Sequence, residues 1–276
     1  LPEFDIEGNP RIVGERVDIG AYEFNFSTVL NAAVLPYARA VQVNETATAF
    51  GSVINSGTST ATDCAISLPD GISAEFTYQS TNANNVLVGS PNTPVDIPAG
   101  GTQSFVFGIT PFSPLNSSEI GLVFDCANSY PAITYIGLNT LILTASSDAP
   151  PDLVAIGATP SNDGIVRLEG PNGAGFFATA AVNIGSSGTV SASADDGGKE
   201  LPVTLQLCET DNAGNWISCG NNLSRSVAAD QTVYYTVFVT GTGQPISFDP
   251  ANKRLFLRFS ANGQTVGATN VAVTTD

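Results

Sequence analysis

The chain has 276 residues, and only 12% of them are charged. An average globular domain carries about 25% charged residues. Here Ser, Thr, Asn, Gly and Ala fill the deficit, as is typical of a secreted all-β protein. Nine basic residues against twenty-five acidic ones give a net charge of −16. We therefore expect no nucleic-acid partner and no anionic membrane partner, because both would be repelled. No apolar run approaches about eighteen residues, so membrane insertion is not expected either.

The first 25 residues differ in pattern from the rest of the chain. Two apolar runs, Ile12-Val13 and residues 17–24, lie on either side of a turn and predict two short strands. The sequence begins at Leu1 and contains no Met. We therefore expect a processed product or a fragment, from which any signal peptide has been removed.

Residues 18–23, with the sequence DIGAYE, resemble the closing coil of the right-handed parallel β-helices found on many bacterial surface and secreted proteins. A closing coil stacks on earlier coils, and the sequence contains no pattern for such coils. The resemblance implies either that a β-helix domain lay upstream or that the segment is used differently here.

The apolar positions of this segment also define a candidate assembly strand. Such a segment can add a strand to the sheet edge of a neighbouring copy, and head-to-tail repetition of that contact builds an open filament. The alternative is that the segment packs on its own first domain. We therefore expect the partners to be other copies of the chain or an upstream β-helix domain. The candidate assembly residues are Phe4, Ile6, Ile12, Val13, Val17, Ile19, Tyr22 and Phe24.

Residues 36–147 have the pattern of a first β-sandwich. Short runs rich in Val, Ile, Phe and Thr are separated by Gly, Pro, Asn and Ser clusters roughly every ten residues. Residues 26–35 are either a linker or a first strand, and we place residues 1–35 in an N-terminal β segment with its linker. The predicted strands of the first domain are 38–43, 46–54, 61–68, 74–79, 103–109, 120–125 and 138–144.

Within that domain, residues 47–69 predict a strand, a turn and a second strand. We expect Asn55 and Gly57 to supply the positive φ angles that such a turn needs. A similar stretch recurs around Asn183 and Gly185 in the second half of the chain.

Residues 148–276 repeat the pattern as a second β-sandwich. The linker between the domains contains Pro150-Pro151, which favours an extended, semi-rigid connection. Segments of the two domains match in the same order: 98–107 with 228–237, 121–128 with 255–263, and 137–144 with 267–274. The predicted strands are 153–158, 164–168, 175–183, 189–194, 202–208, 232–240, 254–260 and 270–274.

These patterns predict an all-β fold of two tandem Ig-like β-sandwiches, preceded by a short N-terminal β segment. The Asn-x-Gly turn, the following Leu-Pro and the PAGGT sequence at residues 98–102 resemble bacterial Ig-like surface modules of the adhesion-domain kind. Tandem modules build stalks, fibres and adhesins, because each module spaces the next. The resemblance implies a non-catalytic extracellular protein of a bacterial surface, either a fibre subunit or an adhesin stalk. A glycan or a host-cell receptor is then a candidate partner.

Four cysteines and no histidine favour two disulfides in an oxidising compartment over a zinc site. Four buried thiols are the alternative. A bridge between Cys64 and Cys126 would pin the two sheets of the first sandwich, as in Ig-like domains. Cys208 and Cys219 are eleven residues apart and would staple a hairpin with a polar tip.

The sequence contains no catalytic motif, so we expect the protein not to be an enzyme. The absence of His excludes Ser-His-Asp and Cys-His systems, and no phosphate-binding loop or nucleophile elbow occurs. A glycosidase needs two facing carboxylates, for which Glu75, Asp96, Glu119 and Asp125 are candidates in number only.

Two loops are candidates for binding. Asp195, Asp196, Asp211 and Asn215 offer oxygen ligands to calcium, although ordinary turns use the same residue types. Trp216, the only tryptophan, would either stack on a sugar ring or fold back onto its own sheet. A carbohydrate- or calcium-binding accessory module of a secreted enzyme is therefore the alternative function.

Overall fold

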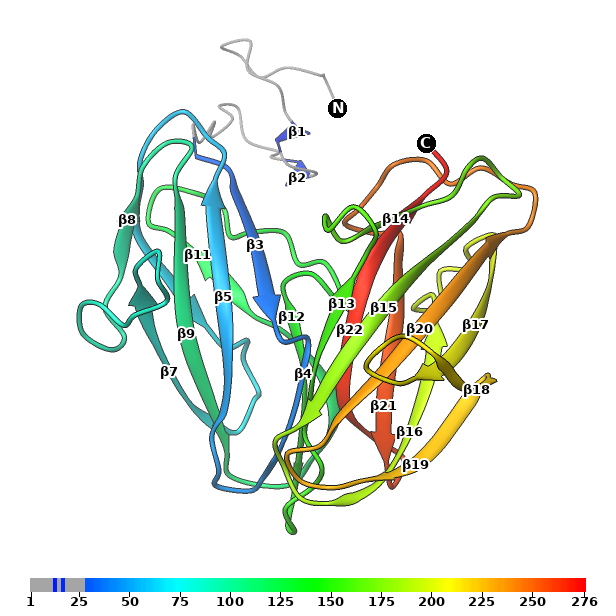
Figure 1. The fold of residues 1–276 in the computed structure, drawn as a ribbon. Helices are drawn as coiled ribbons and strands as arrows, with labels where there is room; N and C mark the ends of the chain where they lie inside the picture. Colours follow the sequence, from blue (N-terminus) through cyan, green and yellow to red (C-terminus); the bar gives the residue numbers. More distant parts are fainter. Residues whose placement is uncertain (1–11, 14–15, 18–27) are drawn as a thin grey trace.

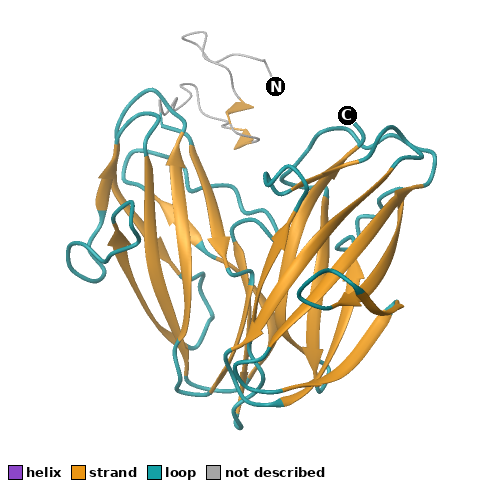
Figure 2. Ribbon diagram, in the orientation of Figure 1, coloured by secondary structure: helices purple, strands orange, loops and turns teal. Residues whose placement is uncertain are grey.

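Strands alternate with tight turns along the chain, because runs of β-branched and aromatic residues are interrupted by Gly, Pro, Asn and Ser. The computed structural model describes residues 12–13, 16–17 and 28–276. They form an all-β fold of two β-sandwiches that contact each other along one side (Figure 1). Figure 2 shows only strands and loops in the described part. No helix in that part has the length and hydropathy of a membrane span.

The N-terminal segment contributes one short ladder. β1 (Ile12–Val13) pairs antiparallel with β2 (Arg16–Val17), which agrees with the two short strands predicted around a turn. Residues 18–23, which carry the β-helix resemblance, lie outside the described residues. That interpretation therefore stays a prediction.

The first sandwich consists of two facing layers. One layer, which we call the β5 sheet, has the order β3-β5-β9-β7. The facing layer has the order β4-β12-β10 and continues as β11-β6-β8. Phe105, Phe107 and Phe124 belong to the core between the layers. The strands are β3 (Leu30–Leu35), β4 (Ala38–Gln42), β5 (Ala47–Asn55), β6 (Ala61–Ser67), β7 (Ala74–Thr81), β8 (Val95–Ile97), β9 (Thr102–Pro111), β10 (Leu115–Gly121), β11 (Val123–Asp125) and β12 (Thr140–Ser146).

The second sandwich is one sheet folded over on itself, in the order β18-β17-β20-β15-β13-β22-β21-β16-β19, with β14 beside β22. The sheet bends between β13 and β22, which are paired only through Leu153↔Gly267. We call β18-β17-β20-β15-β13 the β15 sheet. The strands are β13 (Leu153–Ala158), β14 (Ile165–Arg167), β15 (Ala174–Asn183), β16 (Gly188–Asp195), β17 (Val203–Thr210), β18 (Trp216–Gly220), β19 (Asn222–Val227), β20 (Thr232–Gly241), β21 (Arg254–Ala261) and β22 (Gln264–Thr274).

Both sandwiches have the same topology. β3 pairs with β5 and β13 pairs with β15, both antiparallel. β4 pairs with β12 and β14 pairs with β22, both parallel. The segments that match in sequence fall on β9 and β20, on β11 and β21, and on β12 and β22. The chain therefore contains one Ig-like module twice, with β18 as an addition to the second copy.

A strand that is buried on both faces joins the two sandwiches. Six consecutive residues of β12 are buried. Leu141 and Leu143 belong to the first core, whereas Ile142 packs in a separate cluster that contains Phe256 of the second sandwich. The Phe256 ring lies 5.7 Å from the ring of Tyr37, between centroids. The sandwiches therefore share a small apolar core of their own.

An ion pair and several hydrogen bonds complete this interface. Arg39 on β4 contacts Asp152, which precedes β13, with its Nε and Nη2 atoms both 2.9 Å from Oδ2. The Ala40 amide donates to Oδ1 of the same carboxylate at 3.0 Å. Burial raises the pKa of Asp152, while Arg39 and the Ala40 amide oppose that rise. Asn270 Nδ2 also donates to the Gly137 carbonyl at 2.8 Å across the interface.

The Pro150-Pro151 linker is fixed in place by the second sandwich. The Ser186 amide donates to the Pro150 carbonyl at 2.9 Å, and Pro151 and Asp152 are buried. The connection is thus stiff, as its composition predicts. Its stiffness comes from bonded contacts as well as from the two prolines.

Candidate interaction surfaces

The disulfides of the structure join the pairs Cys64–Cys126 and Cys208–Cys219. The expectation that Cys64–Cys126 pins the two sheets is wrong. Cys64 lies on β6 and Cys126 directly follows β11, and these strands are hydrogen-bonded neighbours in register Asp125↔Ala65. The bridge therefore ties two strands of one layer, because cysteines that continue this register meet directly across the ladder.

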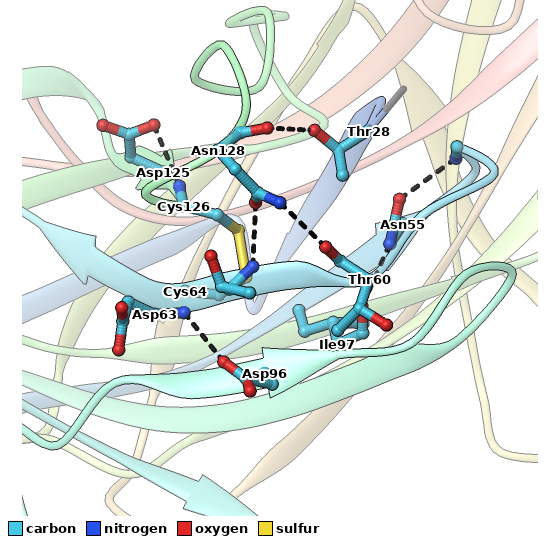
Figure 3. The surroundings of a disulfide bond; sticks show 12 residues. Thr28, Asn55, Thr60, Asp63, Cys64, Asp96, Ile97, Asp125, Cys126 and Asn128 are labelled. Atoms are coloured by element: carbon cyan, nitrogen blue, oxygen red, sulfur yellow. Dashed lines mark hydrogen bonds between the residues drawn. A yellow bond between two sulfur atoms is a disulfide. The ribbon is translucent and has the colours of Figure 1, made fainter. Parts of the chain in front are cut away.

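Side chains around this disulfide anchor the start of the first sandwich (Figure 3). Asn128 Oδ1 accepts the Thr62 amide at 2.9 Å, and Asn128 Nδ2 donates to the Thr60 carbonyl at 2.9 Å. The Thr28 hydroxyl donates to the Asn128 carbonyl. The residues that lead into β3 are thereby attached to the disulfide-bonded strands. The sequence left open whether residues 26–35 form a linker or a first strand. In the structure, β3 occupies the second half of that range.

Two buried asparagines hold equivalent turns, by a mechanism that differs from the predicted one. Neither Asn55 nor Gly57 is among the described residues with positive φ, so that expectation is wrong. Asn55 acts through its side chain, which donates to the carbonyls of Ile97 at 3.0 Å and Ser59 at 2.8 Å. Its Oδ1 atom accepts the Gly57 amide at 3.0 Å.

Asn183 makes corresponding contacts in the second sandwich and, in addition, accepts the amide of Asp152. It donates to Ser186 and Ala228 carbonyls at 2.8 and 3.1 Å and accepts the amide of Gly185. Both asparagines are 0% exposed. The motif is therefore a structural lock for the strand that follows, and the two asparagine side chains are unavailable to a ligand.

The outer face of the β15 sheet combines apolar and aromatic side chains with small polar ones, mostly threonine. Register pairs such as Ile156↔Ala180, Ala180↔Tyr234 and Phe176↔Phe238 place its side chains in rows across the strands. Among the described residues that these ladders place on the face, none is charged. They are Val154, Ile156, Ala158, Ala174, Phe176, Ala178, Ala180, Val182, Thr204, Gln206, Cys208, Thr210, Trp216, Cys219, Thr232, Tyr234, Thr236, Phe238 and Thr240.

The stapled hairpin β17–β18 borders this face. Cys208 and Cys219 are direct partners across the two strands, as the expected staple requires. Trp216 contacts Phe238 edge to face with ring centroids 5.4 Å apart, yet it remains 68% exposed. One part of the ring therefore packs on its own sheet while most of it stays accessible. Phe176 and Phe238 are tilted by 44° to each other, so the three rings form a cluster and not a flat platform.

A hollow of about 370 Å³ lies between this hairpin and the sheet face. Its floor includes Ala178, Ala180 and Tyr234, and Ile156 stands at its side with 70% of its surface exposed. The hairpin loop at residues 211–214 forms the opposite wall, and Figure 1 shows this loop in front of β15 and β20. The small alanine side chains leave the space open, and the lining is mainly apolar.

The calcium candidates are engaged in their own turns. Asp195 accepts the Gly197 amide and pairs with Arg258 at 2.8 Å. Asp196 accepts the amides of Gly198 and Leu201. Asp211 accepts two backbone amides and the side-chain amide of Asn215, and these bonds hold the pKa of its carboxyl below the usual value. Among the described residues, no three His, Cys, Asp or Glu side chains are grouped to hold a metal. The calcium hypothesis gains no support from this geometry.

Three of the four acidic candidates for catalysis are structural partners, and the fourth, Glu75, is exposed on β7. Glu119 accepts hydrogen bonds from the Tyr37 and Thr140 hydroxyls. Asp96 accepts the Asp63 amide, and Asp125 accepts the Cys126 amide. Of the assembly residues, Ile12, Val13 and Val17 lie on the β1–β2 ladder. Phe4, Ile6, Ile19, Tyr22 and Phe24 lie outside the described residues.

Comparison with known proteins assigns no family. No protein-family model and no curated protein matches the chain. Solved structures with some likeness include the adhesin InvE of Yersinia pseudotuberculosis, at 13% identity over 90% of this chain and 58% of that one, with a TM-score of 0.24. The major pilin subunit BcpA of Bacillus cereus, in its D312A form, has 8% identity over 89% and 69% of the chains, with a TM-score of 0.32.

The secreted serine protease VesC of Vibrio cholerae has 14% identity over 82% of this chain, with a TM-score of 0.25. The chain spans about half the length of that protease, 49% of it. All three TM-scores are below 0.5, so these likenesses carry no assignment of an activity, a ligand or a partner.

Proposed function

We propose that the chain is a non-catalytic structural protein of the bacterial cell exterior, and that it acts as a fibre subunit or as part of an adhesin. The observation that carries this proposal is the fused pair of sandwiches. A buried apolar cluster, a buried ion pair and a bonded linker hold the two modules in one orientation. Two disulfides add covalent cross-links suited to an oxidising exterior. A rigid, cross-linked pair of modules is suited to bearing load.

The positions of the strand ends favour the fibre subunit over the stalk. β3 begins and β22 ends at the same end of the molecule (Figure 1). In a stalk, each unit passes the chain from one end to the other, so that units extend in line. Here an extended assembly would need contacts between separate copies. In this proposal, residues 1–25 supply one such contact by docking on a neighbouring copy.

Negative-stain electron microscopy of the full chain, beside a variant without residues 1–25, tests this proposal. We expect filaments from the full chain and none from the truncated one, with both proteins folded by circular dichroism. If neither protein forms filaments at any concentration, the fibre proposal fails. If both form equivalent filaments, residues 1–25 are not the assembly strand.

Exposure of Trp216 on a stapled hairpin favours carbohydrate binding as a second candidate function. Aromatic side chains on rigid loops can stack on sugar rings. A glycan array with the wild-type protein and the Trp216→Ala variant tests it. Binding that is lost in the variant would support the candidate, and an array without any signal would exclude the glycans tested.

A further inference from the structure

The outer face of the β15 sheet contains a mainly apolar hollow beside the stapled hairpin. The socket, as we name it, consists of Ile156, Ala178, Ala180, Tyr234 and the hairpin loop at residues 211–214, which enclose the hollow described above. Apolar surface of this kind is uncommon on a chain with net charge −16, because soluble proteins usually cover sheet faces with polar residues. The socket carries one charged residue, Asp211, whose carboxylate is bonded within its own turn, and the rest of the lining is mainly apolar. It therefore favours aliphatic side chains.

The first sandwich carries a protrusion of matching chemistry. The connection between β7 and β8 exposes three consecutive aliphatic residues, Val86, Leu87 and Val88, which are 58%, 53% and 39% exposed. No charged residue occurs between Glu75 and Asp96. We name residues 82–88 the knob. In Figure 1 this connection projects from the first sandwich on the side away from the second.

Hydrogen bonds make the knob rigid. The Asn85 amide donates to the Asn82 carbonyl at 2.9 Å, and Asn82 Oδ1 accepts the Val86 amide at 3.1 Å. Leu87 forms a β-bridge with Thr81, and the Val88 amide donates to the Ser80 carbonyl at 2.9 Å. The three apolar side chains are therefore held outward before any contact forms, which lowers the entropy lost on binding.

We propose that the knob of one copy inserts Val86, Leu87 and Val88 into the socket of the next copy. This inference rests on the proposed fibre function and identifies a second contact within it. Two copies at −16 repel each other. The knob has no charged residue, so its contact with the socket sets no like charge opposite Asp211. In Figure 1 the knob lies at the outer edge of the first sandwich, and the hairpin loop that borders the socket lies on the second sandwich, in front of β15 and β20. The contact joins two different surfaces, so in this proposal it is heterologous, and its repetition builds an open chain of subunits.

Self-association of the full chain, measured by sedimentation velocity over a concentration series, tests the contact. Leu87→Asp alters the knob and Ala180→Asp alters the socket. We expect each to weaken association by about tenfold or more, since each loses a buried apolar contact and places a carboxylate in it. Phe112→Asp is the matched control, because Phe112 is 57% exposed outside both surfaces. It should associate as the wild type does. Added salt should strengthen wild-type association by screening the repulsion.

A mixing experiment distinguishes this contact from a symmetric one. An equimolar mixture of the L87D and A180D proteins retains one intact knob and one intact socket. It should form dimers at concentrations at which each variant alone is monomeric. A mixture that stays monomeric, or variants that associate like the wild type, would overturn the inference. If those variants still form filaments that deletion of residues 1–25 abolishes, the fibre function stands without this contact. If the wild-type protein never associates, both fail.

Discussion

Asn55 and Asn183 show how one residue type can hold the same turn twice. Each side chain serves as donor and acceptor for backbone groups that are buried or partly buried and would otherwise lose these partners. The sequence displays both residues in the same motif, and this made the repeat visible. Their role could not be predicted, because an Asn before a Gly usually indicates a backbone φ requirement, and the burial that gives the side chain its partners depends on strands remote in sequence.

Replacing either asparagine should therefore lower the stability of the fold substantially. We expect Asn55→Ala and Asn183→Ala each to lower the free energy of unfolding by about 3 kcal/mol, because several buried backbone groups lose their partner. Urea titration followed by circular dichroism measures this. Asn222→Ala, at an exposed position, is the control and should change stability little. A loss below about 0.5 kcal/mol in the buried variants would contradict the proposed lock.

Tyr235 gives a prediction for alkaline pH. Burial, with a smaller contribution from Glu209, raises the pKa of Tyr235 to about 12 from its ordinary 10.0. The unfolded chain releases this proton first, so the free energy of unfolding should fall as pH rises from 10 towards 12. Tyr235→Phe removes this group and should make that fall less steep. Unfolding in urea at a series of pH values checks it, and equal slopes in the two proteins would refute it.

Strands and hairpins differ in how clearly the sequence marks them. Alternating strands such as β5 and β20 follow their predicted ranges closely, because period-two burial is encoded locally. β8 has three residues and β18 has no alternation in burial, so neither gave a signal. The mainly apolar socket also escaped prediction. It is assembled from residues on several strands, and only the register brings them together.

The two disulfides should differ in their contribution to stability. Cys64 and Cys126 are 62 residues apart and Cys208 and Cys219 are 11 apart. In the chain-entropy model these loops correspond to about 4 and about 3 kcal/mol. We expect Cys64→Ser/Cys126→Ser to lower the urea midpoint more than Cys208→Ser/Cys219→Ser. Loss of the Cys208–Cys219 bridge should mainly loosen the hairpin, and faster hydrogen exchange of the β18 amides would report this. The reverse order of midpoints would contradict this.

At the scale of the whole molecule, the sequence predicts two like modules but not their fusion. The tandem repeat, the all-β class and most strands follow from local patterns and from the matched segments. The shared interface depends on β12, whose run Leu141-Ile142-Leu143 is continuous and not alternating. Such a run indicates a strand covered on both faces. The signal was present, but only the structure identifies the second sandwich as the cover.

The interface should make the two sandwiches unfold together. We expect one calorimetric transition for the wild-type protein. Phe256→Ala removes a ring from the shared cluster and should separate that transition into two, because the modules lose their coupling. Phe259→Ala, in the second core, is the matched control. It should lower the free energy of unfolding by about 3–5 kcal/mol and so lower the transition temperature. Two transitions already in the wild type would show that the modules are independent.

The two-sided burial of β12 also has a consequence for biosynthesis. The first sandwich can complete its ladders once Ser146 has been made, whereas Phe256 and Ala268, which cover Ile142, are translated about 110 residues or more later. Until they arrive, the nascent first module exposes a strip of aliphatic surface that invites aggregation. We therefore expect evolution to keep the two modules together and to move them between proteins as one unit. Each module alone would expose the apolar surface that the other one covers.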